Sequence, residues 1–247
     1  MQKRVYNLKI ERLPESKLNH LMFSKSINIS KNVDLRSKMP PIYDQGHLGS
    51  CTANALCGLL AHDNPKIQGS RLFLYYNERI LRKTTSTDSG ATLEDGVTSL
   101  IKNGICQENE WPYIINRFSI KPPVKCYTSA LQHRVLEKNT RNIKNDLNCM
   151  KECLSNNLPF VVGILIYESF ESQAVANTGI VPMPNTKKEN LLGGHAILCV
   201  GYNDALKVWI MRNSWGKNWG AAGYFYLPYA YLLSPELSSD LWTISDI

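Results

Sequence analysis

One stretch of this chain decides its fold: residues 43–56, which read Y-D-Q-G-H-L-G-S-C-T-A-N-A-L. Two stretches far downstream belong with it, G-G-H-A at residues 193–196 and R-N-S-W-G at residues 212–216. They supply Cys51, His195 and Asn213: a thiol, an imidazole and an amide that can meet in space although they are distant in sequence. Together they predict a nucleophile, its base and the group that orients the base.

The residues after Cys51 favour a helix that begins at the thiol. Residues 51–62 place three leucines on one apolar face, and glycines with Ser50 precede them, as in a turn that leads into a helix. Cys51 would then lie in the first turn, where unpaired backbone amides and the helix dipole favour a thiolate. A neighbouring imidazolium acts in the same direction, so we expect a thiolate–imidazolium pair.

Four residues receive a role in this chemistry. His195 would take the proton of the Cys51 thiol and later return it to the leaving group. Asn213 would hold the imidazole ring by accepting a hydrogen bond from one of its nitrogens. Gln45 precedes Cys51 across a Gly-x-x-Gly turn, and its side-chain amide would join the Cys51 backbone N–H as an oxyanion hole.

These motifs resemble those of the papain-like cysteine peptidases, the cathepsin family. Members carry Q-G-x-x-G-x-C at the nucleophile, a strand that opens with histidine, and then N-S-W-G-x-x-W-G. This chain has Q-G-H-L-G-S-C at residues 45–51 and N-S-W-G-K-N-W-G at residues 213–220. The resemblance covers about residues 33–228. It implies an α+β fold with two lobes, a helical half and a β-sheet or barrel-like half, and an active site in the cleft between them.

The resemblance also implies where a peptide substrate binds. The residues expected to line the cleft are Ser89, Gly90, Ala91, Leu93, Gly163, Gly194, Ala196 and Trp215. The first three stand where members place a Gly-Gly pair, whose bare backbone can hydrogen-bond an extended peptide. Leu93, Gly163 and Ala196 would form the pocket for the second residue of the substrate, which we expect to be apolar or small. Trp215 would shield the hydrogen bond between Asn213 and His195 from water.

Two departures from the family pattern lie beside the nucleophile. Secreted members carry a cysteine three residues before it, where this chain has Leu48, and often a tryptophan directly after it, where this chain has Thr52. Neither departure removes a catalytic group, but the first puts the usual disulfide framework in doubt. Cys57, Cys153 and Cys199 lie in apolar segments and are expected to be buried thiols. Whether any disulfide forms among the six other cysteines stays open, including a pair that flanks a loop, Cys106 and Cys126.

Hydrophobic periodicity divides the chain into a helical half and a strand-rich half. It predicts helices over residues 51–62, 70–83, 92–103 and 145–156, and strands over residues 160–166, 196–201, 207–211 and 224–227. We therefore expect a peptidase domain over residues 33–247, with a helical lobe at about 45–120 and a β-rich lobe at about 121–228 that a C-terminal tail follows. Residues 1–32 are expected to be an N-terminal arm or a short prosegment-like extension. This segment would be packed on the body or partly disordered, or it would form a short plug or gate near the cleft.

Composition excludes several classes of protein. The 247 residues carry a net charge of +7 and are 43% hydrophobic, which is ordinary for a globular chain. No apolar run reaches the ~18 residues of a membrane span, no motif indicates nucleic-acid binding, and no cysteine or histidine spacing indicates zinc. We expect a monomer without metal or cofactor. Because no signal sequence is seen and the cysteine usage is that of a reducing compartment, we expect it in the cytoplasm.

The sequence therefore predicts a cysteine-type peptidase that cleaves protein or peptide substrates through an acyl-enzyme. We expect an endopeptidase, because no inserted loop carries paired histidines that would bind the free carboxylate of a substrate. One alternative is an isopeptidase that acts on ubiquitin conjugates, since an uncontrolled broad protease would be hazardous in a cytoplasm. The other is a papain-like scaffold without catalysis that binds proteins or an acidic surface.

Overall fold

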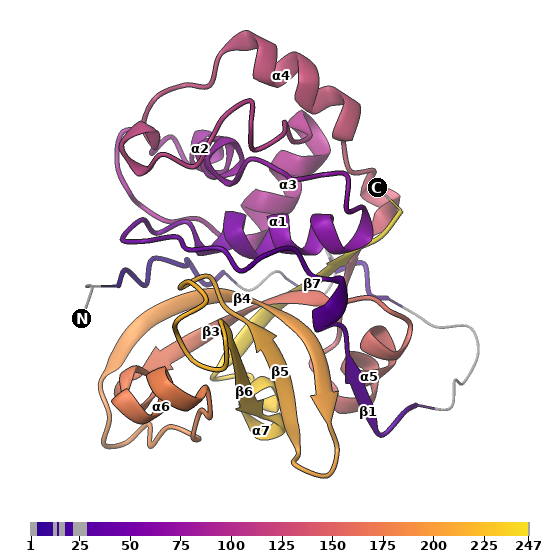
Figure 1. Ribbon diagram of the computed structural model, residues 1–247, viewed down its shortest axis with the longest axis vertical. Coiled ribbons are helices and arrows are strands. Elements are labelled where there is room, and N and C mark those ends of the chain that lie inside the picture. The colour runs from indigo at the N-terminus through magenta and orange to yellow at the C-terminus, as the bar shows by residue number, and fades with distance from the viewer. Residues whose placement is uncertain (1–3, 12–13, 15–17, 22–28, 247) are drawn as a thin grey trace.

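The computed structural model describes residues 4–11, 14, 18–21 and 29–246 of the chain. Figure 1 shows a lobe made of helices α1 to α4 above a lobe built on a β-sheet, against which α5, α6 and α7 pack. The helices are α1 (Cys51–Asp63), α2 (Arg71–Leu81), α3 (Leu93–Asn103), α4 (Val124–Ala130), α5 (Leu147–Ser155), α6 (Gln173–Thr178) and α7 (Tyr229–Leu233). This two-lobed α+β arrangement is the fold predicted from the sequence.

The sheet is antiparallel and open. Its strands are β1 (Asn32–Asp34), β2 (Thr140–Asn142), β3 (Phe160–Tyr167), β4 (Leu191–Asn203), β5 (Val208–Arg212), β6 (Tyr224–Pro228) and β7 (Ser238–Ile244). Neighbours follow the order β2-β7-β3-β4-β5-β6, and β1 pairs with β4 outside this path. Among the described residues β2 and β6 end the path, so the half expected to be barrel-like is a curved sheet that does not close.

The boundaries predicted for α2 and α3 agree closely with the structure because their capping residues could be identified in the sequence. Ser70 caps α2 by accepting a hydrogen bond from the backbone N–H of Phe73. Thr92 and Asp95 form a reciprocal capping box at the start of α3. Gly104 ends α3 with a φ of 71°, a backbone conformation that favours glycine.

Strand β4 begins five residues before the strand predicted from the sequence. The prediction started at Ala196, where the continuous apolar run begins, whereas Gly193 and Gly194 precede it and glycine is depleted in strands. Pairing with β3 overrides this local preference: Gly194 lies opposite Leu165, His195 opposite Ile164 and Ala196 opposite Gly163. The longer strand carries His195 within its length and not at its end, so the residues before and after His195 are also paired with β3.

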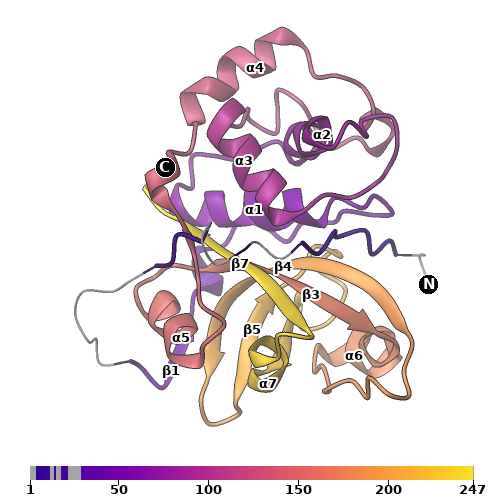
Figure 2. The same ribbon diagram turned by 180° about the vertical axis from the view of Figure 1, so that it is seen from behind.

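The segment expected to be a C-terminal tail contains β7, which lies between β2 and β3 in the sheet. Its sequence S-S-D-L-W-T-I begins polar and includes Asp240 at a φ of 60°, so no clean alternation marked it as a strand. In Figure 2 β7 crosses the back of the molecule and ends beside the helical lobe, where the C-terminus lies. The tail is thus a structural strand that reaches both lobes.

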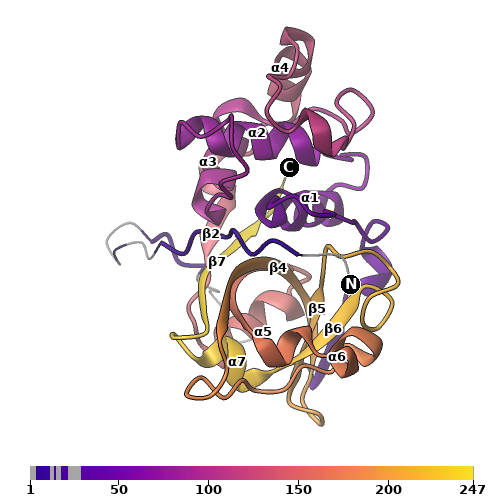
Figure 3. The ribbon, with the colours of Figure 1, turned by 90° about the vertical axis from the view of Figure 1, so that its left-hand side faces the viewer.

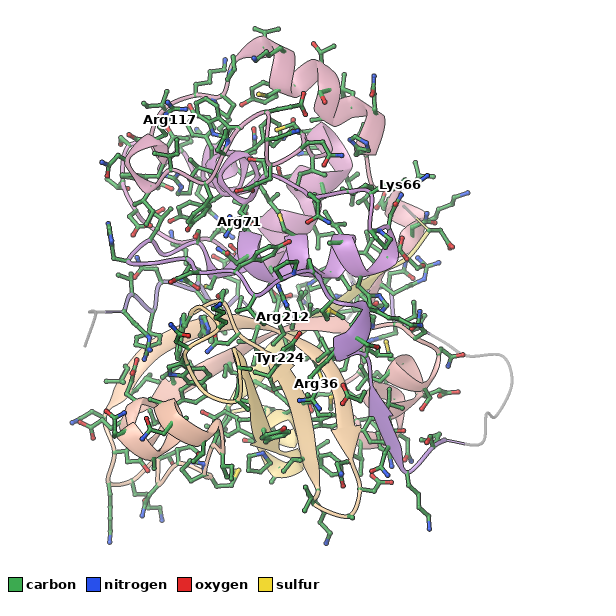
Figure 4. All side chains as sticks on the ribbon, viewed as in Figure 1. Arg36, Lys66, Arg71, Arg117, Arg212 and Tyr224 are labelled. Carbon is green, nitrogen blue, oxygen red and sulfur yellow. The ribbon has the colours of Figure 1, made fainter. Side chains whose placement is uncertain are left out.

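Stacked cationic and aromatic side chains also join the lobes. The guanidinium of Arg71, on α2, lies 4.5 Å from the centre of the Tyr43 ring, and that of Arg212, on β5, lies 5.0 Å from it. Arg212 is buried and donates hydrogen bonds to the carbonyl oxygens of Pro40 and Pro41, at 2.8 and 2.5 Å. Figure 4 labels the two arginines, one on each side of the boundary between the lobes. The segment before the nucleophile is therefore held by both lobes.

All seven cysteines are free thiols. Cys57, Cys153 and Cys199 are completely buried, as predicted, and neither Cys106 nor Cys126 is in a disulfide. Within the described part of the chain, every helix is too short or too polar to cross a bilayer.

Candidate active site

The first residue of α1 is Cys51, at the boundary between the lobes. Its side chain is completely buried. Burial raises the pKa of the Cys51 thiol, and the backbone N–H groups of Ala196, Thr52 and Cys51 oppose this shift. Helix α1 packs against β4, the strand that carries His195, so the thiol and the imidazole come from facing elements of the two lobes.

The imidazole of His195 has one defined partner and one open nitrogen. Its Nε2 lies 2.9 Å from Oδ1 of Asn213, and the backbone N–H of Ser214 donates to the same Oδ1 at 2.8 Å. A backbone N–H can only donate, so that atom is an acceptor and Nε2 of His195 must carry the hydrogen. Nδ1 is buried and has no hydrogen-bond partner among the described residues. It is therefore free to accept the proton of the thiol.

Trp215 covers the imidazole. The two rings stack with centroids 4.8 Å apart and an angle of 22° between their planes. Trp219 packs edge-on against Trp215, with centroids 4.8 Å apart. These rings keep water away from the hydrogen bond between His195 and Asn213, which is the position that the sequence predicts for Trp215.

Gln45 is buried and makes one hydrogen bond at each end of its side-chain amide. Its Oε1 accepts a hydrogen bond from the Ser214 hydroxyl at 2.5 Å, and its Nε2 donates to the carbonyl of Leu48 at 2.9 Å. An amide nitrogen carries two hydrogens, so one remains for a substrate oxyanion. The bond to Ser214 comes from the segment that also carries Asn213, so the oxyanion donor and the orienter of the base are fixed together.

A polar chain that sequence reasoning missed supports this loop. Asn54 Nδ2 donates to Ser50 Oγ at 3.1 Å, Ser50 Oγ lies 2.5 Å from the Tyr113 hydroxyl, and Tyr113 donates to the carbonyl of Gln45 at 3.0 Å. Because the Tyr113 hydrogen goes to Gln45, Ser50 is the donor to Tyr113. Tyr113 lies in an irregular loop far from the nucleophile motif, and no role in the site was predicted for it.

A second missed group is Asp88, which joins the nucleophile loop to the substrate wall. Its carboxylate accepts hydrogen bonds from the backbone N–H of Gly49, at 3.0 and 3.1 Å, and from the hydroxyl of Tyr75. The Tyr75 oxygen in turn accepts from the N–H of Gly90 at 3.1 Å. This network ties residues 46–50 to residues 89–91 in a chain that has Leu48 where secreted members have a cysteine.

The N-terminal arm, defined here as residues 4–11, lies along the boundary between the lobes, as Figure 3 shows. Its backbone pairs with residues predicted to bind substrate: Leu8 N–H donates to Gly194 O at 3.2 Å and Lys9 N–H to Ala91 O at 3.0 Å. The Asn7 side chain donates to the carbonyl of Asp88 at 2.8 Å. Residues 4–11 of the segment therefore lie in the cleft, the position that the sequence suggested for a plug.

The glycines of the cleft give the arm room. A Cβ on Gly90, which has a φ of 68°, would lie 1.8 Å from the carbonyl oxygen of Asn7. Leu8 is buried, and its Cδ2 lies 2.9 Å from where a Cβ on Gly163 would stand. Gly163 pairs with Ala196 across the sheet. Of the residues predicted for the apolar pocket, Gly163 therefore lies against a leucine side chain, and Ala196 is its partner in the sheet.

Ser89 and Leu93, which were also predicted to bind substrate, are engaged within the protein itself. The Ser89 hydroxyl donates to Thr84 Oγ1 at 2.7 Å and to the carbonyl of Gly90 at 3.1 Å, so it is engaged within its own loop. Leu93 is completely buried as the first residue of α3. In the described part of the chain, no group of three or more His, Cys, Asp and Glu side chains is placed to hold a metal ion.

The covered site favours a neutral pair. Burial raises the pKa of Cys51 to about 12 and lowers the pKa of His195 to about 4. The positive charge of Arg4 on the arm lowers the pKa of His195 further, and the bond to Asn213 opposes this. The thiolate–imidazolium pair expected from the sequence is therefore disfavoured while the arm excludes water, because neither charge is solvated.

Glu78 lies beneath the nucleophile helix and holds a proton near neutral pH. It is completely buried, its Oε2 accepts a hydrogen bond from Thr52 Oγ1 at 2.7 Å, and its Oε1 has no hydrogen-bond partner among the described residues. Burial raises its pKa to about 8. Between pH 4.5 and 8 the unfolded chain has lost this proton and the native state has kept it, so native stability falls as the pH rises through this window.

We expect Glu78→Gln to remove that pH dependence. The neutral amide keeps an acceptor for Thr52 and cannot ionise. Relative to the wild type, the variant should gain about 2–4 kcal/mol of unfolding free energy between pH 4.5 and 8, because one pKa unit corresponds to about 1.4 kcal/mol. Urea unfolding at both pH values measures this. A difference between the two proteins that stays constant with pH would contradict the assignment.

Comparison with known proteins agrees with this geometry. The sequence matches the papain family cysteine protease profile over residues 29–231. A relative from Acanthamoeba polyphaga mimivirus, described as a peptidase C1-like protein, is 40% identical over 217 residues, which cover 83% of this chain and 69% of that protein. Cysteine proteinase 1 of Entamoeba histolytica is 28% identical over 209 residues, which cover 81% of this chain and 64% of that protein. The chain thus spans about two-thirds of the length of these relatives.

Solved structures share the fold. Xylellain, a cysteine protease from Xylella fastidiosa, superposes with a TM-score of 0.88 at 35% identity, covering 100% of this chain and 98% of that one. A cysteine protease of Carica candamarcensis in complex with E-64 gives a TM-score of 0.63 at 19% identity, covering 89% and 100%, a likeness of fold alone. With the family matched over most of its length, and with a thiol, an imidazole and an amide assembled between two lobes, this chain belongs to the papain family of cysteine proteases.

Proposed function

We propose that this cysteine protease is an endopeptidase that hydrolyses extended protein segments through an acyl-enzyme. The observation that carries the proposal is the hydrogen bond from His195 Nε2 to Asn213, which leaves the buried Nδ1 as an acceptor with no other partner among the described residues. Nδ1 takes the thiol proton, and the sulfur attacks the carbonyl carbon of the substrate. The second Nε2 hydrogen of Gln45 and the Cys51 N–H bind the oxyanion.

The imidazolium of His195 then protonates the leaving amine, and the peptide bond breaks to leave a thioester on Cys51. Water attacks this thioester while His195 accepts its proton, and the free thiol returns. Asn213 keeps the imidazole in one orientation through all of these proton transfers. No metal or cofactor takes part in any of these steps.

Endopeptidase action is supported by the course of the arm. It continues in both directions past His195, from Arg4 paired with Glu171 at one end to Glu11 paired with Arg82 at the other. A cleft that holds a chain on both sides of the nucleophile can also hold the middle of a substrate. Leu8 lies beside Gly163. This supports a preference for an apolar residue at the second substrate position on the acyl side of the cleaved bond.

We further propose that the arm is a gate. The family resemblance places the acyl side of a substrate along residues 89–91, and the arm reaches this wall with Lys9 after it has passed His195. It therefore runs opposite to a substrate, so that its carbonyls are not presented to Cys51 as a substrate's would be. It occupies the cleft and is not a good substrate for it.

The two alternatives raised by the sequence gain nothing from the site. Neither the relatives named above nor the contacts of the described cleft residues favour ubiquitin conjugates over other extended chains. The non-catalytic scaffold is disfavoured because Cys51, His195, Asn213 and Gln45 are all present, with His195 bonded to Asn213 and Gln45 bonded to the neighbouring Ser214.

An epoxide reagent for thiols tests the proposal. We expect one adduct per chain, mapped by mass spectrometry to Cys51 among the seven cysteines, and loss of peptide turnover in proportion to the labelling. Cleavage of a denatured protein at internal bonds would establish endopeptidase action. Turnover that persists in a fully labelled chain would overturn the mechanism, and reaction with a ubiquitin C-terminal probe but not with peptides would favour the isopeptidase.

A further inference from the structure

At the N-terminal end of the arm, the guanidinium of Arg4 lies among an acidic side chain and two tryptophan rings. Arg4 Nη1 lies 2.5 Å from Oε2 of Glu171, in the 3₁₀ turn Glu168–Glu171. The guanidinium carbon of Arg4 lies 4.1 Å from the centre of the Trp215 ring and 5.8 Å from that of Trp219. The two charged side chains are only 21% and 23% exposed. A carboxylate and two indole faces thus surround one guanidinium.

The position of this site relative to the catalytic groups follows from the order of the arm. Leu8 lies at Gly163, on the acyl side of the cleft. Tyr6 comes next towards the N-terminus, with its ring 6.3 Å from that of His195 and 6.0 Å from that of Trp215. Arg4 lies beyond them over the outer face of Trp215. The cation site is therefore on the leaving-group side of the nucleophile.

We propose that Glu171, with Trp215 and Trp219, forms a guanidinium-binding subsite that selects substrates carrying arginine on the leaving-group side of the cleaved bond. The inference rests on the proposed proteolysis and names part of its substrate class. In the resting chain Arg4 of the arm occupies this subsite, and an arginine of the substrate takes its place when the arm leaves.

The chemistry of the subsite explains why it takes arginine. The face of an indole carries negative electrostatic potential and stacks well on a planar guanidinium. Glu171 neutralises the charge within a hydrogen bond. The other acidic side chains near this turn are engaged elsewhere: Glu168 accepts from Asn190, and Glu189 accepts from Ser169 and Asn185. Glu171 is therefore the carboxylate that this turn presents to the cleft.

The first test profiles cleavage of a peptide library. The Leu8→Asp chain frees the cleft, for reasons given in the Discussion, and serves as the parent. We expect arginine at the first or second leaving-group position to be enriched about tenfold over glutamine, which corresponds to about 1.4 kcal/mol. Adding Glu171→Gln should reduce the enrichment to about twofold, because the indole faces remain. Adding Glu168→Gln, which removes the same charge from the same turn, should leave it unchanged.

The second test measures binding without catalysis. The Cys51→Ala chain with Leu8→Asp is titrated by calorimetry with a peptide of residues 4–11 and with the same peptide carrying Arg4→Ala. The loss of the arginine should weaken binding about tenfold for the parent and less than threefold when Glu171→Gln is also present, as a double-mutant cycle requires.

The outcomes separate the subsite from the proposed function. Cleavage without enrichment of arginine, or a peptide that binds equally well with Arg4→Ala, overturns the subsite and leaves the peptidase intact. Arginine-dependent peptide binding in a chain that cleaves nothing supports the subsite and overturns the peptidase. Equal loss of enrichment in the Glu168→Gln and Glu171→Gln chains would assign the preference to general charge and overturn the specific role of Glu171.

Discussion

Replacing Cys51 by alanine is expected to lower kcat/KM for peptide cleavage by roughly 10⁴–10⁶-fold, the loss typical of removing a nucleophile that works as a unit with its base. The sulfur is the atom that forms the thioester, and no other described side chain beside His195 offers a nucleophile. Steady-state peptide assays with the Leu8→Asp chain as parent measure the effect, since the free cleft gives the largest range.

Cys57→Ala is the matched control. Cys57 lies on the same helix and is also completely buried, but burial raises the pKa of its thiol and it has no imidazole partner in the described structure. We expect its loss to leave kcat/KM within about twofold while it costs some stability through the small cavity it leaves. If Cys57→Ala abolished cleavage and Cys51→Ala did not, the assignment of the nucleophile would be wrong.

Replacing Leu8 by aspartate is expected to open the cleft. Leu8 is 8% exposed and lies against Gly163 and Gly194, so a carboxylate at this position would be buried without a partner. The arm should then leave the cleft, and the rate at which iodoacetamide labels Cys51 should rise about 100-fold at pH 7, which corresponds to about 2.7 kcal/mol. Ile10→Asp introduces the same charge at an arm residue that is 37% exposed and should change the rate by less than threefold.

The pH dependence of labelling gives the arm prediction a second signature. With the arm in place the pKa of Cys51 is about 12, so labelling should rise about tenfold for each pH unit between 6 and 9, in step with the thiolate fraction. In the Leu8→Asp chain water reaches both groups, which lowers the pKa of the thiol and raises that of His195. Labelling should then level off near neutral pH. Identical profiles for the two chains would contradict the gate.

The catalytic residues could be predicted from sequence because each lies in a local motif with its own chemical signature. Cys51 stands at a helix start after glycines, and Asn213 begins a run with Trp215 and Trp219. The elements that were predicted share this property: α2 and α3 carry their caps within a few residues. Residues that are close in the sequence were therefore sufficient to predict an element or a catalytic residue wherever its structure depends on those same neighbours.

The parts that were missed depend on contacts between distant segments. Asp88 and Tyr75 act through a network that spans two loops, and no spacing in the sequence announces it. β7 is a strand because β2 and β3 lie on either side of it, although its own sequence is polar at the start. The charge state of Cys51 and His195 also depends on a remote segment, since the arm that buries them is more than 40 residues away in the chain.

The arm and the cleft it fills belong to the same polypeptide. This determines how occupancy of the cleft depends on protein concentration and on competing ligands. A tethered segment faces its site at an effective concentration in the millimolar range, whatever the amount of protein in solution. Dilution therefore does not empty the cleft, and a free copy of the segment competes poorly with the attached one. Release of the arm therefore requires an event on the connecting segment, such as proteolytic cleavage or a partner that pulls on it. Alternatively, a ligand must bind the cleft more strongly than the attached arm does.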